Sequence, residues 1–191
     1  MNNVNNVGTI NNISLIYPSI PLFSQAHQID ENAFCNQTHK PATCNEEEPC
    51  FCLHRIKVKL NAVVELSIVD ITEQIGSMYH PFHLHGYSFV VQDIGIFPKN
   101  YTLEDQKNSK PEGYVARAFP LKDTVLIPSR GFVRIKFLAN NPGYWMIHCH
   151  YEPHLSIGMG MILQVGEIED MINAPKGFPT CNDYKPKIAF P

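Results

Sequence analysis

Two short stretches rich in histidine constrain this chain more than any other feature, because both carry metal-binding side chains at alternating positions. One runs from His80 to His85, and the other, which adds a cysteine and a methionine, runs from His148 to Met159. Successive side chains of an extended strand point to opposite faces of a sheet. Cys149 therefore faces away from the histidines on either side of it, so one segment can serve two metal sites.

The first of these two sites has the ligands of a blue-copper centre. A cysteine, two histidines and a long axial methionine hold the copper in such centres. The second stretch supplies Cys149, His154 and Met159, so one ligand has to come from elsewhere. His80 lies an odd number of residues from the two later histidines of its stretch, and Pro81 restricts it to extended geometry. We therefore expect His80 to be the fourth ligand.

The second site collects the four remaining imidazoles. His83 and His85 share one face of their strand, and His148 and His150 share one face of theirs. We expect the four to meet on the opposite side of the sheet from Cys149, on the order of 10 Å from the first site. A lone His-x-His pair is usually a surface feature, whereas six histidines with matching parity predict metal binding.

At this point a family resemblance can be stated. His-Pro-Phe-His-Leu-His-Gly at 80–86, together with His-Cys-His-x-x-x-His-x-x-x-x-Met at 148–159, resembles the C-terminal copper motifs of multicopper oxidases. The wider sequence resembles the laccase branch found in insects, with supporting segments at 12–18, 54–58, 123–128 and 141–145. The resemblance covers most of the chain, but only the last of the three cupredoxin domains of such enzymes. It implies an all-β, cupredoxin-like Greek-key β-sandwich.

The resemblance also assigns the copper ligands. It implies type 1 copper at His80, Cys149, His154 and Met159, type 2 copper at His83, and type 3 copper at His85, His148 and His150. The parent enzymes take single electrons from phenolic or diphenolic donors at type 1 copper and reduce O2 to water at a trinuclear cluster. By this resemblance, His154 is the entry point for electrons, and Cys149 passes them to His148 and His150.

The chain departs from the family in one respect. Multicopper oxidases complete the trinuclear cluster with two further His-x-His motifs from their first domain, and this sequence has no match to them. The type 1 set is complete, but only half of the cluster's usual imidazoles are present. We therefore expect the isolated chain to reduce O2 poorly, and to need N-terminal cupredoxin domains or a complementary subunit.

Two other functions compete with this interpretation. The chain could be a small blue-copper electron-transfer domain, although such a carrier has no use for the four additional histidines. It could also be a truncated fragment that keeps the fold without oxidase activity of its own. Within the oxidase class, ferrous iron is the alternative donor to phenols.

The strand pattern supports a β-sandwich independently of the motifs. Alternating apolar residues predict about seven short strands and no amphipathic helix, which is typical of two packed sheets. A helical turn is expected only at 151–157, with Pro153 near its start. We expect a copper domain at 54–170, preceded by an edge strand and cysteine-rich arm at 1–53 and followed by a proline-rich tail at 171–191.

Six cysteines are present in the 191 residues. Two disulfides are expected among Cys35, Cys44, Cys50 and Cys52, with Cys50 and Cys52 too close to pair with each other and the other pairings open. A less favoured alternative is a zinc site at Cys44, Cys50, Cys52 and His54. Cys181 is left over; in laccase-like chains a C-terminal cysteine can bridge to another domain, and the alternative is a free surface thiol.

Several features are typical of a secreted glycoprotein. Cysteine-rich composition suits an oxidising compartment, and glycosylation sequons begin at Asn12, Asn36 and Asn100. The first residues have neither the basic region nor the apolar core of a signal peptide, so we expect Met1 to be an internal residue or the start of a truncated gene model. A net charge of −3 argues against nucleic-acid binding. No apolar run approaches the roughly 18 residues of a membrane span.

Overall fold

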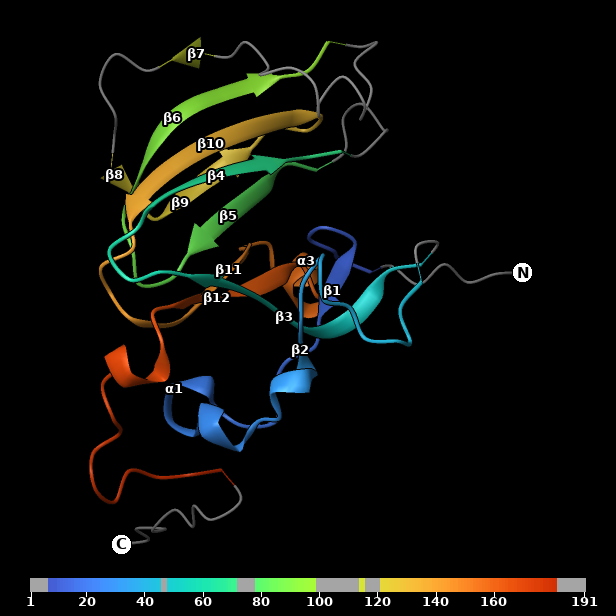
Figure 1. The fold of residues 1–191 in the computed structure, drawn as a ribbon. Helices are drawn as coiled ribbons and strands as arrows, with labels where there is room; N and C mark the ends of the chain where they lie inside the picture. Colours follow the sequence, from blue (N-terminus) through green and yellow to red (C-terminus); the bar gives the residue numbers. More distant parts are fainter. Residues whose placement is uncertain (1–6, 46–47, 72–77, 99–113, 116–120, 182–191) are drawn as a thin grey trace, which may run out of the picture.

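Two β-sheets enclose the main hydrophobic core (Figure 1). The structure is a computed structural model that describes residues 7–45, 48–71, 78–98, 114–115 and 121–181. The larger sheet has the order β1-β3-β12-β11-β5-β9, with β2 also paired to β3. Its strands are β1 (Ile13–Leu15), β2 (Phe34–Cys35), β3 (Cys50–Val58), β5 (His80–Leu84), β9 (Thr124–Ile127), β11 (Gly143–Cys149) and β12 (Gly160–Val165).

The smaller sheet covers the other side of the core. It has the order β4-β10-β6-β7, and β8 also pairs with β6. Its strands are β4 (Val63–Val69), β6 (Phe89–Ile96), β7 (Tyr114–Val115), β8 (Leu121–Lys122) and β10 (Gly131–Leu138). Two short α-helices, α1 (Leu22–Gln25) and α3 (Glu152–Ser156), and 3-10 turns at Ala26–Gln28, Glu31–Ala33 and Ile168–Asp170 complete the described elements.

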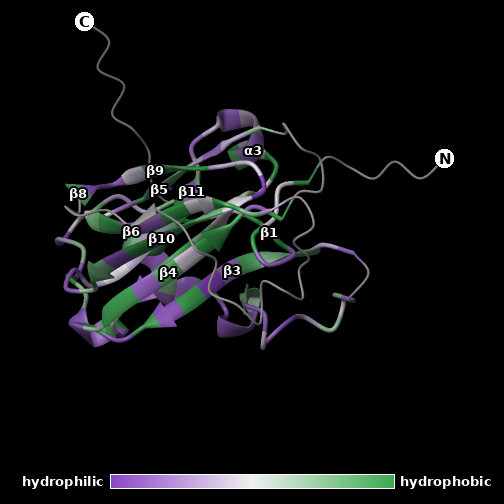
Figure 2. Ribbon diagram, turned by 90° about the horizontal axis from the view of Figure 1, so that it is seen from above, coloured by the Kyte–Doolittle hydropathy of each residue, from purple (hydrophilic) through white to green (hydrophobic). Residues whose placement is uncertain are grey.

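The core forms because apolar residues alternate along the strands. In β10 the buried side chains include Val133, Ile135 and Phe137, which join the main cluster with Phe82 of β5 and Leu163 of β12. Figure 2 shows hydrophilic and hydrophobic residues alternating along β3, β4 and β10. Alternation of this kind lets each sheet bury one face, and the predicted all-β sandwich is confirmed.

Local predictions hold in part. Apolar alternation along residues 55–72 predicts two strands joined by a turn at Asn61, and Asn61 has a positive φ of 64°. Helix α3 contains Pro153 in its first turn, as expected. The strand predicted from residue 55 begins earlier, at Cys50, because its first half pairs in parallel with β1 and β2. The sequence also predicts a long polar insertion at 96–122, which lies largely outside the described residues.

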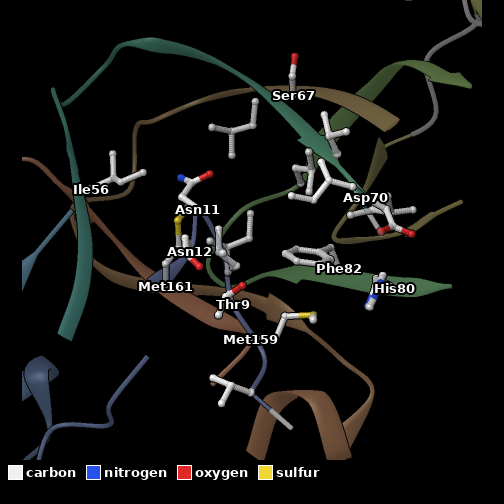
Figure 3. Close-up of a pocket in the computed structure, with 18 residues that line it drawn as sticks. Thr9, Asn11, Asn12, Ile56, Ser67, Asp70, His80, Phe82, Met159 and Met161 are labelled. Atoms are coloured by element: carbon white, nitrogen blue, oxygen red, sulfur yellow. The ribbon is translucent and has the colours of Figure 1, made fainter. Parts of the chain in front are cut away.

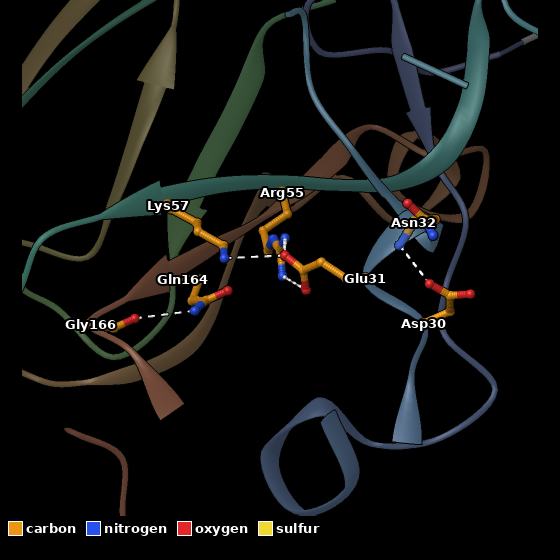
Figure 4. A network of polar contacts seen from close by, with 7 residues as sticks. All are labelled: Asp30, Glu31, Asn32, Arg55, Lys57, Gln164 and Gly166. Carbon is orange, nitrogen blue, oxygen red and sulfur yellow. Dashed lines mark hydrogen bonds and ion pairs between the residues drawn. The ribbon is translucent and has the colours of Figure 1, made fainter. Parts of the chain in front are cut away.

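The N-terminal arm is fastened to β3 by covalent and ionic contacts. Disulfides join Cys35 to Cys52 and Cys44 to Cys50, so both expected bridges form. These bonds overturn the zinc alternative, because its three cysteine sulfurs are already paired. Beside them, the Glu31 carboxylate accepts hydrogen bonds from Arg55 and lies 3.2 Å from the Lys57 ammonium (Figure 4).

Arg55 has a second partner in the arm. Its guanidinium stacks 3.6 Å from the centre of the Phe34 ring, and the residue is only 8% exposed. Hydrogen bonding from Arg55 is the main cause that lowers the pKa of the Glu31 carboxyl. A planar guanidinium can stack and form a forked ion pair at once, so Arg55 joins the arm to the sheet that carries the predicted metal ligands.

Candidate metal centre

The two histidine stretches form neighbouring antiparallel strands. In the register of β5 and β11, His83 lies opposite His148, and Phe82 lies opposite Cys149. His83 and His148 therefore share one face of the sheet, whereas Cys149 belongs to the buried core on the other face. The alternation expected from the sequence is what separates the two groups of side chains.

The core-side cluster contains Cys149, His80 and His154. The Cys149 sulfur lies 3.7 Å from Nδ1 of His80 and 3.7 Å from Nδ1 of His154, and these two nitrogens are 3.2 Å apart. A metal ion bonded at about 2.0–2.3 Å to three atoms, in geometry between tetrahedral and trigonal, keeps those atoms roughly 3.2–4 Å apart. The three side chains therefore fit a single ion, and their donor set is that of a blue-copper centre.

Met159 is held next to this triangle by its backbone. Its amide donates to His154 O at 3.0 Å, and its carbonyl accepts from the Cys149 amide at 3.0 Å. Met159 and His80 also line one cavity of about 550 Å³ between the sheets, together with Phe82 and Asp70 (Figure 3). The fourth side chain expected at this site is thus beside it, in a largely apolar setting.

Burial sets the protonation of the core-side cluster. It lowers the pKa of His80 and of His154, and for His80 the nearby His154 adds to the effect while Asp70 opposes it. Neutral imidazoles keep a lone pair for a metal. Burial also raises the pKa of the Cys149 thiol, although the Tyr151 backbone opposes this. A metal ion has to displace that proton on binding.

The second group, called here the imidazole cluster, consists of His83, His85, His148 and His150. Nε2 of His85 and Nε2 of His148 are 3.0 Å apart. The ring of His83 has its centre 4.8 Å from that of His85 and 5.7 Å from those of His148 and His150. Burial, followed by mutual repulsion, lowers the pKa of His85. The four rings are therefore close enough to share metal ions.

Two of these rings are oriented through their Nδ1 atoms. Nδ1 of His83 lies 2.9 Å from the Thr124 hydroxyl and 3.0 Å from the Asp123 carbonyl. Nδ1 of His148 lies 3.0 Å from the Cys149 carbonyl. A carbonyl fixes the proton on Nδ1 and leaves Nε2 as the metal-binding atom. Sequence reasoning missed Thr124 and Asp123, because they belong to another strand region brought close only by folding.

The imidazole cluster opens to solvent on one side. His148 is only 4% exposed and His83 is half-buried, whereas His85 and His150 are exposed. His27 and His39 belong to neither histidine stretch, so the sequence predicts that they are surface residues; both are exposed and lie in the N-terminal arm.

The fold and the ligand clusters together define a cupredoxin-type copper domain. The multicopper oxidase family model matches residues 20–169, so the chain belongs to that family. Laccase-2 of Oryza sativa is 38% identical over 136 residues, covering 65% of this chain and 22% of its own. Laccase-11 of Arabidopsis thaliana is 32% identical over 203 residues, covering 95% of this chain and 34% of its own. The laccase type expected from the sequence is confirmed, by relatives from plants.

A solved structure is similar as well. The laccase from Botrytis aclada is 25% identical with a TM-score of 0.47, and the match covers 63% of this chain and 21% of that one. The chain thus spans about a third or less of the length of the relatives named here. In the part of the chain that the structure describes, no helix is long and apolar enough to cross a membrane.

Proposed function

We propose that this chain is the C-terminal copper-binding part of a laccase-like multicopper oxidase, with its copper domain at 54–170 between the arms 1–53 and 171–191. The triangle formed by Cys149, His80 and His154 is the observation that carries the proposal. In this proposal, type 1 copper would be held by His80, Cys149, His154 and Met159, type 2 copper by His83, and type 3 copper by His85, His148 and His150.

Bound copper would supply one-electron redox chemistry. The whole enzyme would remove one electron from each of four phenolic or diphenolic donors, and four electrons with four protons would convert O2 into two waters. His154 is half-buried and lies in the short helix α3, a position that supports the proposed role of this residue as the entry point for electrons. Cys149 then offers two routes to the imidazole cluster: its peptide bonds to His148 and His150, and its carbonyl's hydrogen bond to His148 Nδ1.

The open side of the imidazole cluster supports a shared site. His85 and His150 are exposed, so further imidazoles can approach them from outside the chain. We propose that N-terminal cupredoxin domains or a complementary subunit supply those ligands. The isolated chain would then bind type 1 copper but reduce O2 poorly.

The test is copper stoichiometry and visible absorption of the copper-loaded chain, repeated with Cys149→Ser. One copper per chain with an intense blue band that the variant loses supports the type 1 site, and leaves the isolated chain as an electron-transfer domain. Three or more coppers with O2 uptake support assembly of the cluster, and parallel assays with a catechol and with ferrous iron identify the donor. A colourless chain without copper overturns the proposal and leaves a fragment that keeps only the fold.

We further propose that the chain is secreted and carries an N-glycan at Asn36. This asparagine lies in the disulfide-bonded arm, and its Oδ1 accepts a hydrogen bond of 2.8 Å from the exposed Thr38 hydroxyl of the same sequon. The sequon at Asn12 ends in Ser14, which is only 3% exposed; the one at Asn100 lies outside the described residues. Mass spectrometry of chain from a secretory host should find glycan at Asn36, and unmodified Asn36 would contradict this.

A further inference from the structure

A segment near the start of the chain, residues 8–17, lies along the loop that carries His154 and Met159. The segment donates several hydrogen bonds to the loop, and each of these bonds ends on a backbone carbonyl of the loop. They run from Gly8 N to Ile157 O (2.9 Å), from Ser14 Oγ to Ile157 O (3.1 Å), from Leu15 N to Gly158 O (2.9 Å) and from Tyr17 Oη to Leu155 O (3.4 Å). Residues 143 positions apart in the sequence are thereby joined.

The segment and the loop also approach each other too closely for larger residues. A Cβ added to Gly8 would lie 2.9 Å from the carbonyl oxygen of His154 and 2.9 Å from Cβ of Met159. On the loop side, Gly158 has a φ of +101°, and a Cβ there would overlap the Ser14 hydroxyl. Backbone therefore packs on backbone directly behind two of the core-side ligands.

The loop buries few of its own residues: among residues 150–159, only Gly158 is buried. Helix α3 within it has no fully buried residue, and its C-terminal end is exposed at Ser156. The Ser14 hydroxyl, by contrast, belongs to a residue only 3% exposed, so water cannot readily replace its bond to Ile157. The bond to Ile157 is therefore a fixed restraint on the loop.

We propose that Gly8 and Ser14 are positioning residues that set the place of Met159, and with it the redox potential of the copper. The inference rests on the proposed type 1 site. In blue-copper sites the axial ligand tunes the potential, and here Met159 is tied by its backbone to both His154 and Cys149. A displacement of the loop by the N-terminal segment would move the axial sulfur relative to the triangle of Cys149, His80 and His154.

The first experiment compares copper-loaded Gly8→Ala and Ser14→Ala with wild type and with Ser156→Ala. Ser156 is the matched control, because its exposed hydroxyl also bonds to a carbonyl of this region, Pro153 O at 3.0 Å. We expect both test variants to retain one copper while the reduction potential, the blue band and the copper hyperfine coupling shift. Ser156→Ala should match wild type. Wild-type values of all three in Gly8→Ala and Ser14→Ala would overturn the inference.

A second experiment needs no copper. Amide hydrogen exchange of the metal-free chain should become about fivefold faster at Met159 in Ser14→Ala, since one lost hydrogen bond is worth about 1 kcal/mol. Exchange in β10 should stay unchanged. Equal acceleration in β10 would indicate general destabilisation and overturn the positioning role. If wild type binds no copper, the proposed function fails, while the exchange data still decide whether Ser14 restrains the loop.

Discussion

His148 lies directly opposite His83 across the β5–β11 pair, while the next residue, Cys149, faces the core with its sulfur 3.7 Å from Nδ1 of His80. One peptide bond therefore connects the two groups of potential ligands. The same strand alternation that buries one face of the sheet separates the groups. A one-residue slip of β11 would exchange their faces, so the register of this pair is the critical feature of the site.

The thiol of Cys149 should be required for the blue colour. Cys149→Ser replaces the thiol with a hydroxyl, which does not ionise near neutral pH. We therefore expect loss of the blue band and of most copper at the core-side cluster. The change in side-chain volume is small, so thermal unfolding should shift little. Visible absorption and copper analysis measure the effect.

Cys181→Ser is the matched control for that substitution. Cys181 is the other free cysteine among the described residues, and it is exposed. A blue band that persists in Cys149→Ser, or disappears in Cys181→Ser, would contradict the assignment of the thiolate ligand.

Thr124 should tune the imidazole cluster through His83. Thr124→Val removes the hydroxyl 2.9 Å from His83 Nδ1, although the Asp123 carbonyl still holds that nitrogen. Loss of such a partner typically weakens metal affinity by 10- to 100-fold, and we expect about tenfold here. Copper titration in a Cys149→Ser background isolates this cluster. Thr38→Val, which changes an exposed threonine of the arm, should leave affinity unchanged; equal affinities for both variants would count against the role of Thr124.

The sequence predicted the sandwich and the grouping of the candidate ligands because both follow from local alternation. His83 and Cys149 fall on opposite faces for the same reason that Val133 and Arg134 do. The contact of Ser14 with Ile157 could not be predicted, because no local pattern specifies which distant carbonyl a buried hydroxyl will meet. Similarly, spacing excluded a bond between Cys50 and Cys52 but could not choose among the other pairings. That choice depends on how β2 docks beside β3.

The two disulfides should contribute unequally to stability. Cys35 and Cys52 are 17 residues apart, whereas Cys44 and Cys50 are 6 apart. Closing the longer loop restricts the unfolded chain more, with contributions of about 3 and about 2 kcal/mol on the chain-entropy model. Urea unfolding of the double variants C35A/C52A and C44A/C50A measures both. A larger loss for C44A/C50A would show that native contacts, rather than loop entropy, dominate.

The buried His54 should make the metal-free protein less stable in mild acid. The side chain is fully buried, with 0% of the residue exposed, and neither ring nitrogen has a hydrogen-bond partner within the described structure. Burial lowers the pKa of His54 from 6.5 to about 4. The unfolded chain therefore takes up a proton below about pH 6.5, whereas the folded chain does so only near pH 4. The free energy of unfolding should fall by about 3 kcal/mol across this window because of this residue alone.

His54→Leu removes both ring nitrogens at similar volume and tests this directly. Protonation of other buried histidines, such as His80 and His148, also lowers the stability of the protein in acid. These residues are present in both the variant and the wild type, so their contribution cancels in the difference. We expect the free energy of unfolding of His54→Leu, relative to wild type, to rise steadily from pH 7 to pH 4 in urea titrations. His39→Leu, at an exposed histidine, is the control. A pH-independent difference between His54→Leu and wild type would mean that His54 finds a partner or water in solution, because only a desolvated imidazole produces this slope.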